Sequence, residues 1–355
     1  MAADSLKPLR DRIDQIDTEV LKLLNERART AHEIGTLKAD GVIYRPERES
    51  QVLRRLADMN TGPLSEQTVR HLFTEVISAC RAIEEPLSVG YLGPRGTFSE
   101  EAARKQFGAS ASGVPCGSID EVFRQVEAQQ LRFGVVPVEN STEGAIGRTL
   151  DLLVSSTVKL CGEVVLPVHQ CLMSAATDRA AVKRILGHAQ SLAQCHEWIT
   201  QNFPQAERVA VVSNAEAARQ AAQDATAASL GSRAAAPLFG LQVLAENIED
   251  QPNNTTRFVV LADRDAAPSG RDKTSLIMSG RNQPGTMHAL LTPFARHGVS
   301  MTRLESRPSR AGLWEYLFFV DVEGHRLDAK VAQALQEVQA DAAFLKILGS
   351  YPVAA

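Results

Sequence analysis

Residues 133–153, FGVVPVENSTEGAIGRTLDLL, decide how the middle of this chain folds. They begin with an apolar, β-branched run over residues 134–138, a pattern typical of a buried strand. The run ends in the polar loop 139–144, and apolar residues at helical spacing follow it. Open α/β sheets build small-molecule sites where a strand runs into such a loop at the start of a helix. An ordinary strand–helix turn has the same local pattern, so the flanking segments must distinguish the two.

The composition indicates a globular protein of two or three domains. The chain has 355 residues, of which 44% are hydrophobic and 23% charged. Its net charge of −4 argues against a general nucleic-acid or membrane surface, and no apolar run is long enough to cross a membrane. The N-terminus carries no secretory signal, and the five cysteines show neither a CxxC pair nor zinc spacing. We therefore expect a cytoplasmic protein with reduced thiols and no metal site.

Short strands and helices alternate over residues 87–263, which predicts a doubly wound parallel sheet in two lobes. Within it we expect a helix at 180–186 and a loop at 188–191. Polar clusters follow or precede three of the strands, and each alone would be an ordinary cap or turn. The clusters are Thr97 with Ser99; Glu139, Asn140 and Ser141; and Asn254, Thr255, Thr256 and Arg257.

This segment resembles the prephenate dehydratase family over its full length. The matching motifs are YLGPRGTFSEEAA (91–103), VVPVENSTEGAIGRTLDLL (135–153), HAQSLAQC (188–195) and NNTTRFVVL (253–261). The resemblance implies a two-lobed α/β domain, similar to periplasmic binding proteins, that converts prephenate to phenylpyruvate without a cofactor. It also implies that Thr256 delivers or orients the proton for the departing hydroxyl. The implied substrate-binding and loop-supporting residues are Thr97, Ser99, Glu139, Asn140, Ser141, Gln190 and Arg257.

Residues 1–86 predict three helices, each with a charged residue on its apolar face. A heptad-like seam on the first helix comprises Leu6, Leu9, Ile13, Ile16, Val20 and Leu23. The same spacing places Arg27 and Lys38 on the seam, where a buried cation needs an anion. Arg10 lies about 100° away in helix phase and reaches a different site or subunit. The second helix carries Arg48 or Glu49 on its inward face, and the third carries Glu84. A coiled-coil dimerisation module with buried ion pairs fits this pattern equally well.

The motifs LRDRIDQID (9–17), LLNERARTAHEIGTLK (23–38) and YRPERE (44–49) resemble the all-helical chorismate mutases. The resemblance implies an intertwined dimer that rearranges chorismate to prephenate without a cofactor. Cys80 and Glu84 occupy places often held by serine and glutamine, and a glutamate can donate to the ether oxygen only when protonated. The implied roles are carboxylate binding by Arg27 and by Arg10 of the partner subunit, ether-oxygen contact by Lys38, and substrate positioning by Arg48 and Glu49.

The last segment predicts the strand and helix order βαββαβ, which is ferredoxin-like. Its motifs NQPG (282–285) and ESRP (305–308) resemble the ACT domain that follows prephenate dehydratases. In that family the two motifs bind phenylalanine between paired domains. The implied effector residues are Asn282, Gly285, Met287, Glu305 and Ser306. A role in dimerisation alone is an alternative.

We therefore predict three domains: an all-helical mutase at 1–87, a dehydratase at 88–265 and an ACT domain at 272–355. The leading hypothesis is a bifunctional enzyme of phenylalanine biosynthesis, dimeric or larger, that acts on chorismate and prephenate and is inhibited by phenylalanine. Two alternatives remain: a dehydratase with a vestigial helical arm, and a non-catalytic amino-acid sensor. Supplying the purified protein with chorismate distinguishes them.

Overall fold

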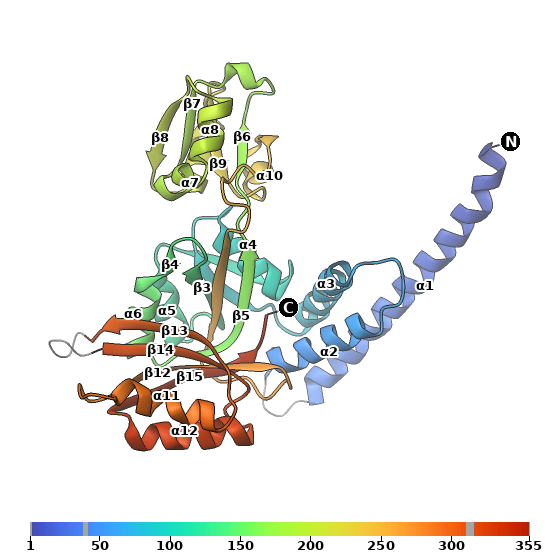
Figure 1. Cartoon of the computed structure of the whole chain (residues 1–355). Helices are drawn as coiled ribbons and strands as arrows, with labels where there is room; N and C mark the ends of the chain where they lie inside the picture. The colour runs from blue at the N-terminus through green and yellow to red at the C-terminus, as the bar shows by residue number, and fades with distance from the viewer. Residues whose placement is uncertain (1, 38–41, 310–315, 355) are drawn as a thin grey trace. The chain divides into compact units, whose positions relative to one another are not determined.

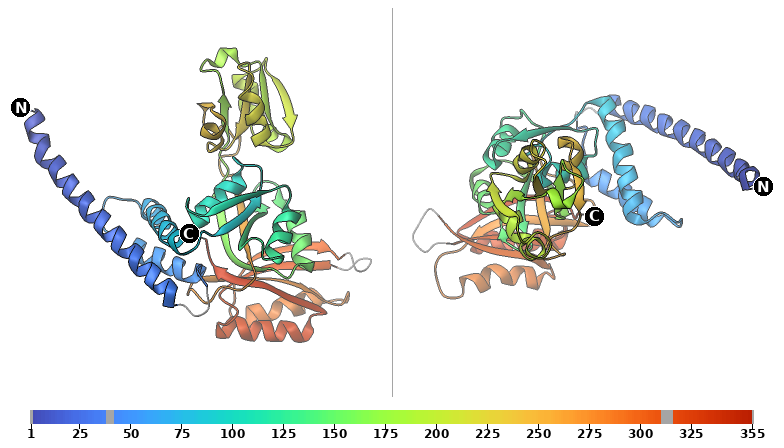
Figure 2. Two further views of the ribbon diagram at one scale, coloured as in Figure 1. Left: turned by 180° about the vertical axis from the view of Figure 1, so that it is seen from behind. Right: turned by 90° about the horizontal axis from the view of Figure 1, so that it is seen from above.

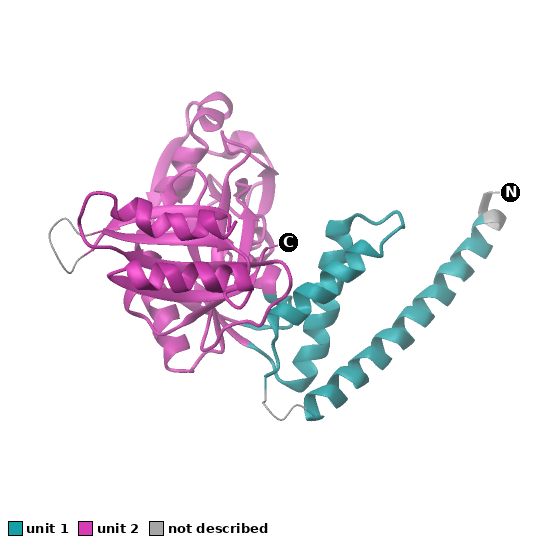
Figure 3. Ribbon diagram, turned by 60° about the horizontal axis from the view of Figure 1, so that its bottom comes forward, with its two compact units in different colours: residues 1–87, 107–112 teal, residues 88–106, 113–355 magenta. Residues whose placement is uncertain are grey.

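The computed structural model describes residues 2–37, 42–309 and 316–354 and divides into two compact units (Figure 3). The first unit comprises Met1–Leu87 with Phe107–Ser112. The second comprises Ser88–Gln106 with Gly113–Ala355.

The first unit is helical, as expected. It contains α1 (Ala2–Leu37), α2 (Pro46–Asp58) and α3 (Glu66–Glu84), which Figure 1 labels. Ser65 caps α3 by accepting a 3.1 Å hydrogen bond from the backbone N–H of Thr68. The apolar seam of α1 is exposed in the single chain; its members are Leu6, Leu9, Ile13, Ile16, Val20 and Leu23. These side chains leave a long apolar surface exposed to water on α1, which is unfavourable in a single chain.

A buried ion pair joins α2 to α3. Arg81 pairs with Glu49, and its Nη2 donates a 2.7 Å hydrogen bond to the carbonyl of Phe107. The guanidinium also lies 5.1 Å from the centroid of the Tyr44 ring. Removing one partner of such a buried pair typically costs roughly 3–5 kcal/mol, because the other charge is left without a partner. The expectation that Glu49 lies inward is confirmed, whereas its partner Arg81 was not predicted.

The first lobe of the second unit is a sheet in the order β2-β1-β3-β11-β5, with β4 beside β3. The strands are β1 (Ser88–Leu92), β2 (Ser112–Cys116), β3 (Phe133–Asn140), β4 (Gly144–Ala145), β5 (Lys159–Pro167) and β11 (Thr255–Ala262). The helices are α4 (Phe98–Phe107), α5 (Ile119–Glu127) and α6 (Gly147–Ser155).

The two-lobed α/β fold is as expected, but the first-lobe sheet is mixed, whereas the sequence pattern indicated parallel strands. β1 and β3 run parallel, but β11 runs antiparallel to both β3 and β5. The chain leaves the first lobe after β5, builds the second lobe, and comes back into the sheet through β11. β11 begins at the end of the sheet where β3 and β5 finish, and it lies between them. Its direction is therefore opposite to theirs.

The second lobe is a sheet in the order β10-β6-β9-β7-β8. Its elements are β6 (Cys171–Ser174), the 3₁₀ turn η1 (Arg179–Ala181), β7 (Arg184–His188), α7 (Ala189–Gln194), α8 (His196–Asn202), β8 (Glu207–Val211), α9 (Asn214–Ala221), β9 (Ala227–Gly231), α10 (Ala235–Phe239) and β10 (Gln242–Ala245). Two segments join the lobes and hydrogen-bond to each other, through Val168 N to Asn254 O at 2.8 Å and Ile248 N to Gln170 O at 3.0 Å.

Two local predictions in this lobe are wrong. The helix expected at 180–186 is instead the short turn η1 followed by strand β7, and the loop expected at 188–191 begins helix α7. Ile185 and Leu186, neighbours along β7, are both buried. A short strand buried on both faces lacks alternation, so periodicity does not separate it from a helix.

The C-terminal segment confirms the βαββαβ order. It contains β12 (Asp272–Ser279), α11 (Thr286–Arg296), β13 (Met301–Pro308), β14 (Tyr316–Glu323), α12 (Ala329–Asp341) and β15 (Phe344–Pro352). Its antiparallel sheet has the order β13-β14-β12-β15, and α11 and α12 lie side by side on one face (Figure 2).

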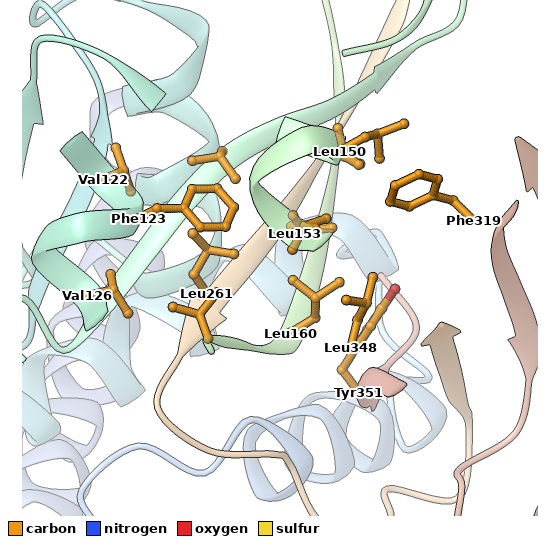
Figure 4. Packing of buried hydrophobic residues seen from close by; sticks show 14 of the residues in the cluster. Val122, Phe123, Val126, Leu150, Leu153, Leu160, Leu261, Phe319, Leu348 and Tyr351 are labelled. Atoms are coloured by element: carbon orange, nitrogen blue, oxygen red, sulfur yellow. The ribbon is translucent and has the colours of Figure 1, made fainter. Parts of the chain in front are cut away.

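The other face of this sheet joins the core of the first lobe. Phe319, Leu348 and Tyr351 belong to one buried cluster with Leu150 and Leu153 of α6, as Figure 4 shows. Such shared apolar burial makes the sheet and the first lobe one packed body.

Candidate active sites

The predicted polar segments meet at one edge of the first-lobe sheet. The parallel strands β1 and β3 end at Leu92 and Asn140, and antiparallel β11 begins at the same edge. In the register of β11 with β3, Thr256 lies directly opposite Asn140. The antiparallel return of the chain therefore brings together two motifs that are far apart in the sequence.

Asn140 fixes the hydroxyl of Thr256. Its side-chain oxygen accepts hydrogen bonds from the backbone N–H groups of Thr142 and Glu143, which are donors only, so the orientation of the amide is determined. Its Nδ2 then donates to Thr256 Oγ1 at 2.9 Å. This bond occupies a lone pair of the hydroxyl oxygen and leaves the hydroxyl proton free to be donated elsewhere. Both residues are buried, at 4% and 9% exposure.

Asn254 adds a second amide beside this pair. Its Oδ1 accepts a 2.8 Å hydrogen bond from Asn140 Nδ2, and the residue is 2% exposed. Its own Nδ2 is buried and has no hydrogen-bond partner among the residues that the structure describes. A buried donor without a partner is costly, so this amide is suited to meet a polar group of a ligand. Asn254 lay in the quoted motif, but sequence reasoning gave it no role.

Ser141 closes the loop after β3 onto the start of β11. Its backbone N–H donates to Thr255 O, and its Oγ accepts from Thr255 N, both at 2.9 Å. These bonds hold the loop in the place that Asn140 requires.

The turn after β1 lies at the same edge. Thr97 Oγ1 donates to Leu92 O at 3.1 Å and accepts from Glu100 N at 3.4 Å, so it acts as a helix cap, as predicted. Glu100 accepts a 2.6 Å hydrogen bond from Gly96 N, so this backbone donor is already bonded within the chain. Ser99 is buried, at 7% exposure. Tyr91 lies on β1 just before the turn, and burial raises the pKa of its hydroxyl to about 12.

Gln190 belongs to the second lobe. It lies in the first turn of α7, directly after β7, with its backbone N–H bonded to His188 Nδ1 at 3.4 Å. A 3.5 Å hydrogen bond from Gln194 Nε2 to Glu143 Oε1 links the same helix to the loop after β3. Gln190 is therefore on a helix that contacts the first-lobe loop, although no hydrogen bond joins it to Asn140 or Thr256 in the part of the chain described.

Glu139 and Arg257 flank the Asn140–Thr256 pair on the opposite face of their strands. Successive side chains of a strand point to opposite faces, so Arg257 points away from Thr256. It bonds Glu163 at 2.8 Å and Tyr351 Oη at 2.9 Å. Burial disfavours the charged form of Arg257, but Tyr351, Asp321 and Glu163 outweigh burial and hold the pKa of the guanidinium above its ordinary value. These contacts indicate a supporting role.

The helical unit gathers part of the second predicted site. Burial raises the pKa of Glu49, and the nearby cations Arg81 and Arg27 only partly offset that increase. The carboxylate of Glu84 fills the space beside Gly35, where a Cβ would collide with it. Cys80 is buried at 5% exposure, and Arg48 is exposed. Arg27, Glu49 and Glu84 thus extend from three different helices of one unit.

Two members of the predicted set are not gathered there. Lys38 lies outside the described residues. Arg10 is exposed on α1, and at 1.5 Å per residue it lies roughly 25 Å along the helix axis from Arg27. Arg10 therefore does not reach the Arg27 site of its own chain.

Two further searches of the described residues are negative. No group of three or more His, Cys, Asp or Glu side chains there could hold a metal ion. No helix in the described part of the chain is long and apolar enough to cross a membrane. All five cysteines are buried and none is paired in a disulfide in the part of the chain that the structure describes.

The three parts of the chain match three families. Residues 9–85 match chorismate mutase type II, residues 89–266 match prephenate dehydratase, and residues 274–340 match the ACT domain. A bifunctional chorismate mutase/prephenate dehydratase of Neisseria gonorrhoeae is 52% identical over 98% of this chain and 97% of its own length. One from Aquifex aeolicus is 42% identical over 99% of both chains. The crystal structure of an Arthrobacter aurescens prephenate dehydratase in complex with L-Phe superposes with a TM-score of 0.69, at 32% identity over 75% of this chain and 90% of that one.

The second unit is thus a two-lobed α/β protein whose polar site lies at the strand ends, followed by a ferredoxin-like sheet. The chain belongs to the bifunctional chorismate mutase/prephenate dehydratase family, and it is an enzyme with both activities.

Replacing Asn140 by Asp tests the orientation of the Thr256 hydroxyl. An aspartate can only accept, so Thr256 would turn its proton toward the new carboxylate and away from substrate. We expect kcat for prephenate to fall about 100-fold, with mutase turnover unchanged. Both rates are measured by following each substrate separately.

Asn202→Asp, a change of the same kind on the exposed helix α8, serves as the control and is expected to leave both rates within about twofold. A dehydratase rate for Asn140→Asp within about threefold of wild type would show that the amide does not orient Thr256.

Proposed function

We propose that this chain rearranges chorismate to prephenate in its helical unit and converts prephenate to phenylpyruvate at the Asn140–Thr256 edge. The single observation that carries the second assignment is the buried hydrogen bond from Asn140 Nδ2 to Thr256 Oγ1. The domains would be residues 1–87, 88–265 and 272–355. The three family matches and the boundary between the compact units at Leu87 and Ser88 support this division.

The dehydratase reaction breaks two bonds of prephenate and makes its ring aromatic. The ring carboxylate leaves as carbon dioxide, its bonding electrons enter the ring, and the ring hydroxyl leaves as water after gaining a proton. We assign delivery of that proton to Thr256, because Asn140 leaves its O–H free. Asn140, Ser141 and Gln190 bind substrate, with Thr97 and Ser99 on the wall of the cleft. The free amide of Asn254 is an additional donor to it.

The mutase reaction needs charge complementarity and a fixed substrate conformer, with no covalent step. In our assignment Arg27 and Arg10 of the partner subunit bind the two carboxylates, while Lys38 and Glu84 contact the ether oxygen. Arg48, Glu49 and Cys80 complete the pocket.

We further propose a homodimer, formed through α1. The exposed apolar seam of α1 and the roughly 25 Å between Arg10 and Arg27 both support it, since a second copy would cover the seam and supply the missing arginine. Five free thiols support a cytoplasmic location, because that compartment is reducing.

The ACT domain is proposed as a phenylalanine sensor. Gly285 adopts a left-handed backbone with φ 84°, and the space where its Cβ would stand is open. Glu305 and Ser306 lie on β13, an edge strand, where a second ACT domain could pair. Asn282 and Met287 flank Gly285. The L-Phe complex of the Arthrobacter prephenate dehydratase supports the same ligand class.

Thr256→Ala separates the two activities. Loss of the proton donor is expected to lower dehydratase kcat by about 10²–10⁴-fold, so that prephenate accumulates from chorismate. Chromatography of the products measures both steps. Thr200→Ala, an exposed threonine of α8, is the control. Near-wild-type phenylpyruvate formation by Thr256→Ala would remove the assignment.

Glu84→Gln tests the mutase site by its pH dependence. The wild-type mutase is expected to lose activity as pH rises, because a deprotonated Glu84 can no longer donate to the ether oxygen. A glutamine donates at any pH, so the pH profile of mutase kcat/KM should be flatter in Glu84→Gln than in wild type. Glu33→Gln, on an exposed part of α1, should keep the wild-type profile. An unchanged profile in Glu84→Gln contradicts the role.

Two matched glycine variants test the effector site. A methyl group at Gly285 would occupy the open space where ligand approaches, whereas Gly298, at the other end of α11, has the same left-handed backbone and open surroundings. We expect calorimetry to show phenylalanine binding at least about tenfold weaker in Gly285→Ala and unchanged in Gly298→Ala. Wild-type protein that neither binds nor is inhibited by phenylalanine would reject the sensor.

A further inference from the structure

Two cross-strand residue pairs face each other between the dehydratase sheet and the ACT sheet, and the first is an ion pair in which Arg257 Nη1 lies 3.8 Å from Glu139 Oε2. Glu139 of β3 lies opposite Arg257 of β11, and Arg303 of β13 lies opposite Asp321 of β14. The pairs also bind across the junction: Arg303 Nε is 3.1 Å from Glu139 Oε2, and Arg257 Nη1 pairs with Asp321. We refer to these four residues as the charge quartet.

Three of the four side chains in the charge quartet are shielded from water. The side chains of Arg257, Asp321 and Arg303 are 13%, 5% and 10% exposed, while that of Glu139 is 39% exposed. Two cations meet two anions, so the group is neutral as a whole. Because buried charges are poorly screened, removing any one of them leaves its neighbour uncompensated.

Of the two ion pairs across the junction, one includes a hydrogen bond and the other does not. Arg257 and Asp321 share a hydrogen bond, and Asp321 also accepts one from Ser275. Arg303 approaches Glu139 closely, but its Nε and Nη2 form no hydrogen bond to any described residue. Arg303 also borders a small cavity that Arg257, Ser275 and Asp321 help to line. The Arg303–Glu139 contact is therefore ionic and has space to adjust.

Each dehydratase member of the charge quartet is covalently next to a member of the proposed active site. Glu139 precedes Asn140, and Arg257 follows Thr256. The 2.9 Å hydrogen bond between Asn140 and Thr256 is thus held at both of its ends by residues that the ACT sheet binds.

We propose that Arg303 and Asp321 are positioning residues for the dehydratase reaction. By holding Glu139 and Arg257, they set the separation of Asn140 and Thr256 and so the direction of the Thr256 proton. A misplacement of about 1 Å can cost on the order of 100-fold in rate, so a contact this close to the donor matters for turnover. The proposal rests on the assignment of Thr256 as proton donor. It also gives the ACT sheet a direct physical route to the site, since Arg303 is on the same strand as Glu305.

Arg303→Gln is the first test. We expect dehydratase kcat to fall roughly 10–100-fold with KM changed by less than about threefold, because the donor is displaced while substrate groups stay. Arg303→Lys keeps the charge and should recover kcat to within about threefold of wild type. Asp321→Asn should act in the same direction as Arg303→Gln. Thermal unfolding of each variant, followed by circular dichroism, reports that the second unit is folded, because mutase turnover depends on the helical unit alone.

Lys346→Gln is the matched control. It also removes a cation of the ACT sheet that contacts the first lobe, but its Nζ bonds the carbonyls of Leu153, Val154 and Ser156 at the end of α6. These residues lie just before Lys159, which pairs with Ala262 at the far end of β11 from Thr256. Dehydratase kcat in Lys346→Gln should stay within about twofold of wild type.

A double-mutant cycle gives the decisive outcome. If Arg303 acts through Glu139, adding Arg303→Gln to Glu139→Gln should lower kcat by less than about twofold further. Effects that multiply in the double variant would overturn the proposal, as would an Arg303→Gln rate no lower than that of Lys346→Gln. Failure of the Thr256 assignment is distinguishable, because it would show as activity retained in Thr256→Ala while these variants keep Thr256.

Discussion

The second unit depends on how the buried charge of Arg257 is compensated. A guanidinium inside a protein is tolerated only when anions and hydrogen-bond acceptors surround it. Glu163 of β5 and Asp321 of β14 supply the anions, and Tyr351 of β15 supplies a further oxygen. Lys273 of β12 in turn pairs with Glu163 at 2.7 Å. The charge of one dehydratase residue therefore determines where three ACT strands lie against the first lobe.

Strand direction determines where the chemistry can occur. Because β11 returns antiparallel, its first residues lie beside the last residues of β3, and Thr256 meets Asn140. The alternation of side chains then sends Thr256 to one face of the sheet and Arg257 to the other. One face holds the buried Asn140–Thr256 pair that we propose as the site of proton transfer, and the other holds the ionic contacts of Arg257. Two neighbouring residues of one motif thus differ in role: Thr256 is the proposed proton donor, and Arg257 fixes the position of the strand.

The features that the sequence predicted correctly are those that depend on a local residue pattern or on a motif. The strand at 134–138, the helices of the first unit, the βαββαβ order and the segments around Asn140 and Thr256 all follow from residue periodicity or from ordered motifs. The direction of β11, the pairing of Glu49 with Arg81, and the free amide of Asn254 did not follow. Each depends on the register between segments far apart in the chain, and periodicity within one segment contains no information about that register. One sequence feature could have pointed to Arg81. It follows the apolar Ile77 by four residues, so both side chains lie on the same face of the helix.

If one chain performs both reactions in order, a time course started with chorismate alone will show both steps. The purified full-length protein is mixed with chorismate, with no other addition, and the products are separated at intervals. We expect prephenate to rise first and then to decline as phenylpyruvate forms, because the two sites lie in separate units and the intermediate diffuses between them. Chorismate left unchanged, or prephenate that accumulates without phenylpyruvate, would contradict this expectation.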